Sequence, residues 1–207
     1  DWTEFPTVLS GCNDADCTER VHHVVVARDH SHLDGFFITG GFATDSTSST
    51  LDDDGGGLFI YETEDVVIRN THFFGNRADD SGGGLAISGG ENVRIEDCVF
   101  TGNEGYADGS AFDVSLSDDV VVRNFVAAGN YHENEDRYGG ISVYGSSITF
   151  ENGVVVGNET DNVGGGFSLY TASGNITNCV VADNQAGDDG GSFYIRTDGD
   201  PTIANVV

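Results

Sequence analysis

Residues 82–103 read GGGLAISGGENVRIEDCVFTGN, and this stretch decides the fold. Apolar residues alternate with small or polar ones in three short runs, at residues 85–87, 93–95 and 98–100. Each run is bounded by Gly, Asn, Asp or Ser, and no apolar stripe recurs at the spacing of a helix face. Alternation with period two in short bounded runs is typical of β-strands separated by turns. The stretch therefore predicts three strands and no helix.

The same block recurs along most of the chain. Its closing asparagines are separated by 27, 27, 28 and 26 residues: Asn76, Asn103, Asn130, Asn158 and Asn184. A second column keeps the same step: Asn70, Asp97, Asn124, Asn152, Asn178 and Asn205. Glycines mark a third phase: Gly55, Gly82, Gly109, Gly139, Gly164 and Gly190. Such self-similarity indicates a stacked solenoid, in which each unit buries its apolar face against its neighbours. We predict an all-β, right-handed parallel β-helix of three-strand coils, with about seven coils of about 27 residues.

The recurring asparagines have a structural explanation. An asparagine tolerates left-handed backbone, and its amide both donates and accepts hydrogen bonds. Stacked copies can therefore bond to each other and to the backbone of the next coil. We interpret the closing asparagines as a structural turn ladder and not as ligands.

Two motifs carry a family resemblance. Residues 73–76 (FFGN) and 100–103 (FTGN), each with a following Gly-Gly-aliphatic run such as residues 83–86, resemble the FxxN and GGA(I/L/V) repeats of polymorphic outer-membrane proteins. More broadly, residues 33–207 resemble the pectin-lyase-like superfamily of right-handed β-helices. Residues 1–32 are expected to form a lead-in or cap that contains Cys12 and Cys17. The resemblance implies the fold, while the superfamily includes enzymes, adhesins and structural modules.

The charge narrows the function classes. The chain has 35 acidic and 8 basic residues, a net charge of −27, and no lysine. A strongly acidic surface disfavours binding to nucleic acid and to anionic membranes. No stretch approaches the roughly 18 apolar residues of a membrane span. We expect an extracellular or cell-surface protein, present here as a mature or excised piece of a longer precursor.

Acidic residues gather just before the glycines, at Asp52, Asp53, Asp54, Asp79, Asp80, Asp108, Asp136, Asp161, Asp188 and Asp189. In a β-helix these acids would line one edge, where unit charges about 5 Å apart repel by roughly 1 kcal/mol even in bulk water. Calcium held by Asp52–54, Asp79, Asp80, Asp188 and Asp189 could offset the repulsion, and so could a high-salt habitat. A solvated acidic edge with loosely held cations is the simpler interpretation. We expect no required cofactor, with Ca²⁺ as the candidate ion.

The cysteines and histidines give further expectations. Cys12 and Cys17 suit a short-loop disulfide in an oxidising exterior. Cys98 and Cys179 fall in one column, too far apart to bridge, and are expected to be buried free thiols. His30 and His32 would share one face of an extended segment, as a metal pair does, although a surface pair without a third ligand is the more common case.

These observations favour a non-catalytic structural or adhesive surface protein, either a stalk or a subunit that stacks end to end. The last coil lacks its closing turn, so we expect an uncapped C-terminal end that continues or docks a second copy. A surface glycan or protein receptor is the other expected partner. Asn175 is the more credible glycosylation acceptor, because the other candidate, Asn158, belongs to the ladder.

The alternatives are a carbohydrate-binding module and a lyase-like enzyme. Catalysis could use residues 118–119 with Arg123, or Arg69 with residues 64–65. An aromatic groove on an outer face would favour glycan binding, and convergent acids with an arginine in a cleft would favour catalysis.

Overall fold

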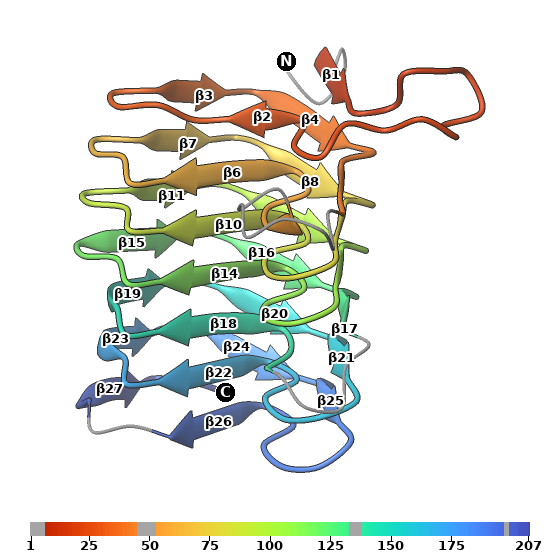
Figure 1. Cartoon of the computed structure of the whole chain (residues 1–207). Helices are drawn as coiled ribbons and strands as arrows, with labels where there is room; N and C mark the ends of the chain where they lie inside the picture. The colour runs from red at the N-terminus through yellow and green to blue at the C-terminus, as the bar shows by residue number, and fades with distance from the viewer. Residues whose placement is uncertain (1–6, 45–52, 133–137, 197–198) are drawn as a thin grey trace.

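The computed structural model describes residues 7–44, 53–132, 138–196 and 199–207. The described chain winds into a stack of coils in which successive strands lie in parallel register (Figure 1). This confirms the predicted parallel β-helix. Each coil passes through three main strands and one short additional strand before the next coil begins.

Three sheets of seven strands run along the stack. The first sheet contains β1 (Thr7–Ser10), β4 (Phe36–Thr39), β8 (His72–Phe74), β12 (Val99–Thr101), β16 (Val126–Ala128), β20 (Val154–Val156) and β24 (Val180–Ala182). The second, called here the front sheet, contains β2 (Val25–Val26), β6 (Leu58–Tyr61), β10 (Leu85–Ser88), β14 (Phe112–Ser115), β18 (Ile141–Tyr144), β22 (Phe167–Tyr170) and β26 (Phe193–Arg196). The third contains β3 (His32–Asp34), β7 (Val67–Arg69), β11 (Arg94–Glu96), β15 (Val120–Arg123), β19 (Ser147–Glu151), β23 (Ser173–Thr177) and β27 (Pro201–Ala204).

A fourth ladder of two-residue strands was not predicted. It contains β5 (Phe42–Ala43), β9 (Arg77–Ala78), β13 (Glu104–Gly105), β17 (Tyr131–His132), β21 (Glu159–Thr160) and β25 (Gln185–Ala186). All of these strands except β5 directly follow a closing asparagine, and they are too short to show an alternating pattern in the sequence. Within the expected lead-in, β1 pairs with β4 and β2 pairs with β6, so parallel pairing begins before residue 33.

The asparagine ladder holds the coils together from inside. Asn103 Oδ1 accepts hydrogen bonds from the backbone N and from Nδ2 of Asn76, both at 3.1 Å. Its Nδ2 donates to Phe73 O at 3.1 Å and to Asn130 Oδ1 at 3.0 Å. The pattern continues through Asn158 to Asn184. Because each amide satisfies the next one, these buried polar groups are paired along the whole ladder.

The second asparagine column works through the backbone. All six members have a positive φ between 46° and 56°: Asn70, Asp97, Asn124, Asn152, Asn178 and Asn205. Asparagine and aspartate adopt this conformation at lower cost than most side chains. The glycine corners need the same freedom: Gly109 has a φ of 62°, and a Cβ there would lie 2.9 Å from the nitrogen of Asp113.

The core changes its aromatic residues along the stack. Phe73 and Phe100 stack with their ring centres 4.9 Å apart in the first sheet. The same column continues with Ala127, Val155 and Val181. Phenylalanines from other columns, Phe112, Phe125, Phe150 and Phe167, fill the space there. The large side chains move from one column to another along the stack, so that the core stays filled, as close packing requires.

Candidate functional site

Acidic corners lie against the outer side of the front sheet. Carboxylate oxygens of Asp53, Asp54 and Asp80 all lie within 4.8 Å of one another. Asp54 Oδ1 accepts a hydrogen bond from the nitrogen of Ser81 at 3.0 Å. Burial, together with the charges of Asp80, Asp53 and Asp108, raises the pKa of Asp54 to about 7. The corner therefore holds a carboxyl group that is partly protonated at neutral pH.

Asp113 extends this group beneath the corner. It is the second residue of β14 and is 5% exposed. Burial is the main cause that raises its pKa well above the usual value, and the charge of Asp108 adds to it. Hydrogen bonds from Ser142 and Ser115 act in the opposite direction. We call Asp53, Asp54, Asp80, Asp108 and Asp113 the acidic corner.

The predicted calcium ligands are only partly brought together. Asp53, Asp54 and Asp80 meet, whereas Asp79 lies 3.3 Å from Arg77 Nε. Asp188 and Asp189 are exposed in the corner before β26, four coils further along. Asp52 and Asp136 lie outside the described residues. The described part of the predicted set therefore gives one compact all-oxygen group, which is the donor chemistry that Ca²⁺ prefers.

Four tyrosines form an aromatic surface beside the acidic corner. The ring centres of Tyr144 and Tyr170 are 5.3 Å apart, and Tyr138 lies 6.0 Å from Tyr170 and 5.9 Å from Tyr194. The guanidinium carbon of Arg196 lies 5.4 Å from the centre of the Tyr170 ring. We call these five residues the tyrosine face.

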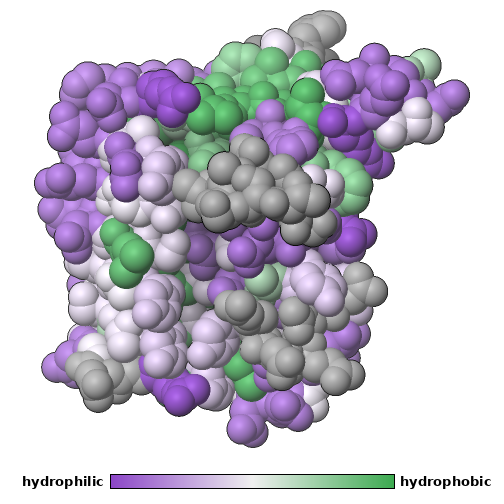
Figure 2. All heavy atoms as spheres, viewed as in Figure 1, coloured by the Kyte–Doolittle hydropathy of each residue, from purple (hydrophilic) through white to green (hydrophobic). Residues whose placement is uncertain are grey.

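The tyrosine face is partly open to solvent, because Tyr144 and Arg196 are exposed whereas its other three tyrosines are part-buried. Tyr144 is 45% exposed, and Figure 2 shows a pale, weakly polar area over the carboxyl ends of β14, β18 and β22, between strongly hydrophilic edges. Tyr144, Tyr170 and Arg196 are cross-strand neighbours in three consecutive coils. Their spacing of 26 residues repeats in the sequence and could have identified this surface before the structure.

The two surfaces are physically connected. The backbone nitrogen of Tyr138 donates a hydrogen bond to Asp108 Oδ1 at 3.1 Å. Burial raises the pKa of Tyr138, and the charge of Asp108 contributes. The outer side of the front sheet thus carries an acidic corner in its middle and an aromatic surface toward the later coils.

A hollow of about 480 Å³ lies under the N-terminal loop. Its lining includes Arg20, Phe42, Arg77 and Glu104. Both guanidinium groups lie over the Phe42 ring, at 5.7 and 5.2 Å from its centre. Arg77 also pairs with Glu104 at 2.8 Å, so one of the two arginines is already neutralised.

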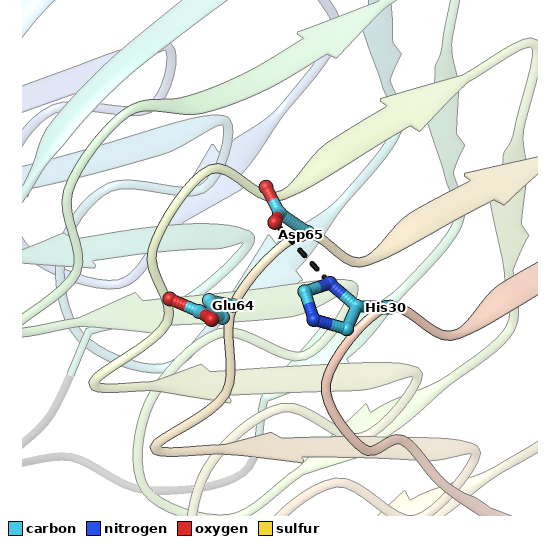
Figure 3. A group of neighbouring side chains, drawn as sticks. All are labelled: His30, Glu64 and Asp65. Carbon is cyan, nitrogen blue, oxygen red and sulfur yellow. Dashed lines mark ion pairs between the residues drawn. The ribbon is translucent and has the colours of Figure 1, made fainter.

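His30 meets two acids and not the expected His32. Figure 3 shows the imidazole of His30 facing the carboxylates of Glu64 and Asp65 across the turns that precede β3 and β7. His30 Nδ1 lies 3.2 Å from Asp65 Oδ2. One ligand atom from each of the three residues falls within 4.8 Å of the others. The His30–His32 pair considered from the sequence required an extended segment, and His30 has a φ of 59°. The structure groups His30 with two carboxylates.

The remaining predicted residues occupy clear positions. Cys12 and Cys17 are joined in a disulfide, with their Cα atoms 4.7 Å apart. Cys98 and Cys179 are buried free thiols, and burial raises the pKa of Cys98 to about 12. Asn175 is exposed on β23, whereas the Asn158 amide is bonded within the ladder.

The arginines considered for catalysis are paired elsewhere. Arg69 Nε lies 2.8 Å from Glu96 Oε2. Arg123 lies 3.9 Å from both Glu96 and Glu151. Neither guanidinium group forms an ion pair with a described residue of the sets proposed from the sequence.

The comparisons identify a family and no individual relative. A family model described as the right handed beta helix region matches residues 31–206. Neither a curated protein nor a solved structure matches the chain. Within the described residues, no helix has the length and apolar character needed to cross a membrane.

Proposed function

Because this chain belongs to the right-handed β-helix family, we propose that it is a non-catalytic structural and adhesive module of the cell exterior, which binds carbohydrate through its tyrosine face. The observation that carries the proposal is the contiguous group of Tyr138, Tyr144, Tyr170 and Tyr194 on an outer face. Exposed aromatic surfaces of this kind mark interaction sites. The disulfide between Cys12 and Cys17 supports an oxidising location.

The chemistry of the face suits a neutral glycan. Tyrosine combines an apolar ring with a polar hydroxyl. Because Tyr144 and Tyr170 stack on each other with their ring planes 12° apart, the face offers ring edges and hydroxyl groups to a pyranose. Arg196 supplies further donors beside Tyr170. A net charge of −27 disfavours polyanionic ligands over most of the surface. The parallel coils place Tyr144 and Tyr170 at successive steps, as successive sugar units of a polymer would require.

Glycan binding can be tested with matched tyrosine variants. Affinity electrophoresis in gels that contain neutral β-glucan, xylan or mannan should retard the chain. Tyr144→Ala with Tyr170→Ala should abolish the retardation. Tyr106→Ala is the control, because Tyr106 is 46% exposed and forms no ring contact with a described residue. Absence of retardation in every polymer, or equal loss in the control, would overturn glycan binding through this face.

Self-association is the second part of the proposal. Apolar side chains are exposed in the outermost coils, including Val8 and Val26 at one end and Ile195 and Ile203 at the other. Strands at such positions also present unpaired backbone groups. Stacking of copies would cover both. Sedimentation velocity should show association that increases with concentration and is lost in Ile195→Asp, but kept in Leu116→Asp, which alters an exposed apolar residue in mid-stack.

A polysaccharide hydrolase or lyase remains the alternative function. The observation that favours it is that Asp54, with a pKa near 7, lies beside Asp80 and close to the tyrosine face. Glycoside hydrolysis uses two carboxyl groups, one of them with a raised pKa. Release of reducing ends or unsaturated products by the wild type, lost in Asp54→Asn, would favour the enzyme over the adhesive module.

A further inference from the structure

We propose that His30, Glu64 and Asp65 form a binding site for a divalent transition metal ion of the Zn²⁺ class. One imidazole nitrogen and two carboxylate oxygens face a common space, with each ligand atom within 4.8 Å of the others. These are donor types that Zn²⁺ binds in proteins. The residues lie at the edge of the stack, away from the tyrosine face and the acidic corner.

The observed spacing already fits a metal ion. Ligand atoms around tetrahedral Zn²⁺ at about 2.0–2.1 Å are separated from each other by about 3.3 Å. His30 Nδ1 and Asp65 Oδ2 are 3.2 Å apart. The Glu64 side chain is exposed, and its ligand oxygen lies no more than 4.8 Å from those of the other two residues, so rotation about its own bonds is the movement expected on binding.

The backbone around the site is held by its own hydrogen bonds. The nitrogen of His30 donates to Glu64 O at 2.9 Å, and Asp29 Oδ1 accepts from the nitrogen of Glu64 at 3.1 Å. Two turns from adjacent coils are thereby fixed against each other. Residues that project from such fixed turns are positioned before the metal arrives, which lowers the entropy cost of binding.

A neighbouring hollow gives the site a second, independent feature. It has a volume of about 250 Å³ and is lined by Asp29, Glu62, Glu64 and Glu91. Thr63 also lines it, and its buried Oγ1 has no hydrogen-bond partner among the described residues. Glu64 and Glu91 are bridge partners one coil apart, so the hollow concentrates negative charge beside the three ligands. The open side of the metal would face further oxygen donors.

Because it contains an imidazole ligand, the His30 site should prefer a different ion from the acidic corner. Ca²⁺ takes oxygen ligands, whereas imidazole suits Zn²⁺, Ni²⁺ and Cu²⁺. His30 should therefore select a transition metal, and the all-oxygen group of Asp53, Asp54 and Asp80 should not. A bound ion would link the turn before β3 to the turn before β7 and stabilise the first coils by linkage.

The test uses the whole chain, freed of metal by chelation. Zn²⁺ titrated by calorimetry should bind at one site with micromolar affinity and raise the melting temperature, and Co²⁺ should give visible absorption bands from a nitrogen- and oxygen-ligated ion. The key variant is His30→Asn, because His30 has a φ of 59° and asparagine tolerates this backbone. It should weaken Zn²⁺ binding at least tenfold and abolish the thermal shift.

Matched variants keep the test decisive. His32→Asn removes an imidazole two residues away and should bind Zn²⁺ as the wild type does. Asp54→Asn alters the acidic corner and should also leave Zn²⁺ binding unchanged. Unchanged affinity in His30→Asn, or loss of Zn²⁺ binding in Asp54→Asn, would overturn the proposal. Circular dichroism of the metal-free variants checks that each is folded, and glycan retardation of His30→Asn is expected to be normal.

Discussion

The closing asparagine position and the last position of the front-sheet strands follow opposite rules in the same coils. Inside, the closing position is asparagine in five consecutive coils, from Asn76 to Asn184. Outside, the last position of the front-sheet strands changes along the stack: Tyr61, Ser88, Ser115, Tyr144, Tyr170 and Arg196. An inner asparagine must match its neighbours because they are its hydrogen-bond partners, whereas an outer residue meets solvent. Repetition of the closing asparagine therefore marks architecture, whereas the last position of the front-sheet strands is free to vary and to form a binding surface.

The sharpest test of this comparison removes one inner asparagine. Asn103→Ala deletes four side-chain hydrogen bonds. It leaves the buried backbone N–H of Asn76 without its acceptor. Since each unsatisfied buried group costs about 1–3 kcal/mol, unfolding in urea should show a loss of about 3–5 kcal/mol. Asn103→Gly should lose at least as much, because the side chain and not the backbone conformation is what this position needs. A loss below about 1 kcal/mol in both variants would contradict the ladder's role.

Much of the interior could be predicted from the sequence because the closing asparagines repeat at a nearly constant step. The asparagine step of 26–28 residues places Asn76 over Asn103, and the hydrogen bonds between them confirm it. The fourth ladder escaped prediction, because two residues such as Arg77 and Ala78 cannot show a period. The redistribution of phenylalanine from Phe100 to Phe112 and Phe125 also escaped, since volume compensation acts between columns and not along one.

A second inner position tests packing in place of hydrogen bonding. A Cβ on Gly153 would overlap the ring of Phe125 from the preceding coil, whose Cδ1 would lie 3.0 Å away. Phe125 is 1% exposed and cannot move aside. Gly153→Ala should therefore lower the free energy of unfolding by about 1–3 kcal/mol, as overpacked cores do. The double variant with Phe125→Leu should recover part of the loss, and failure to recover it would show that packing is not the cause.

A variant of Asp54 in the acidic corner tests an outer position that is nevertheless partly buried. The raised pKa of Asp54 stabilises the fold below the unfolded pKa, and this contribution is lost as pH rises from about 4 through about 7. Asp54→Asn keeps the acceptor for Ser81 and removes the charge. The full pKa shift corresponds to roughly 4 kcal/mol, and solvent screening reduces this effect because Asp54 is only partly buried. The variant should match the wild type at pH 4 and be more stable by about 1–2 kcal/mol at pH 8. Asp188→Asn, which removes one exposed carboxylate elsewhere, is the matched control.

Added calcium distinguishes a specific Ca²⁺ site at the acidic corner from general screening of its charges by salt. If the corner holds Ca²⁺, millimolar CaCl₂ at pH 8 should raise the melting temperature of the wild type and not that of Asp54→Asn. An equal rise in both, reproduced by NaCl at matched ionic strength, would assign the effect to general screening. Either result leaves the predicted zinc site untouched, because His30 lies in a different turn.

The candidate sites were less predictable than the fold because they depend on contacts between irregular segments. Charge clustering in the sequence pointed to Asp54 and Asp80, but it could not show that Asp79 turns to Arg77 instead. His30 was singled out with the wrong partner, since an extended segment was assumed where the backbone has a φ of 59°. A positive φ at a histidine has no signal in the sequence, and it is this turn that directs the ring toward Asp65.

The smallest expected effect distinguishes the two asparagine columns most clearly. Asn124 has a φ of 54°, and among the described residues its side chain bonds only to its exposed neighbours Asp97 and Asn152. Asn124→Ala should cost about 1 kcal/mol, because alanine is strained in left-handed backbone. Asn124→Gly should cost less than about 0.5 kcal/mol, since glycine relieves that strain and the exposed hydrogen bonds contribute little. If glycine is as harmful at Asn124 as at Asn103, the outer column also depends on its side chains, and the distinction between the two columns fails.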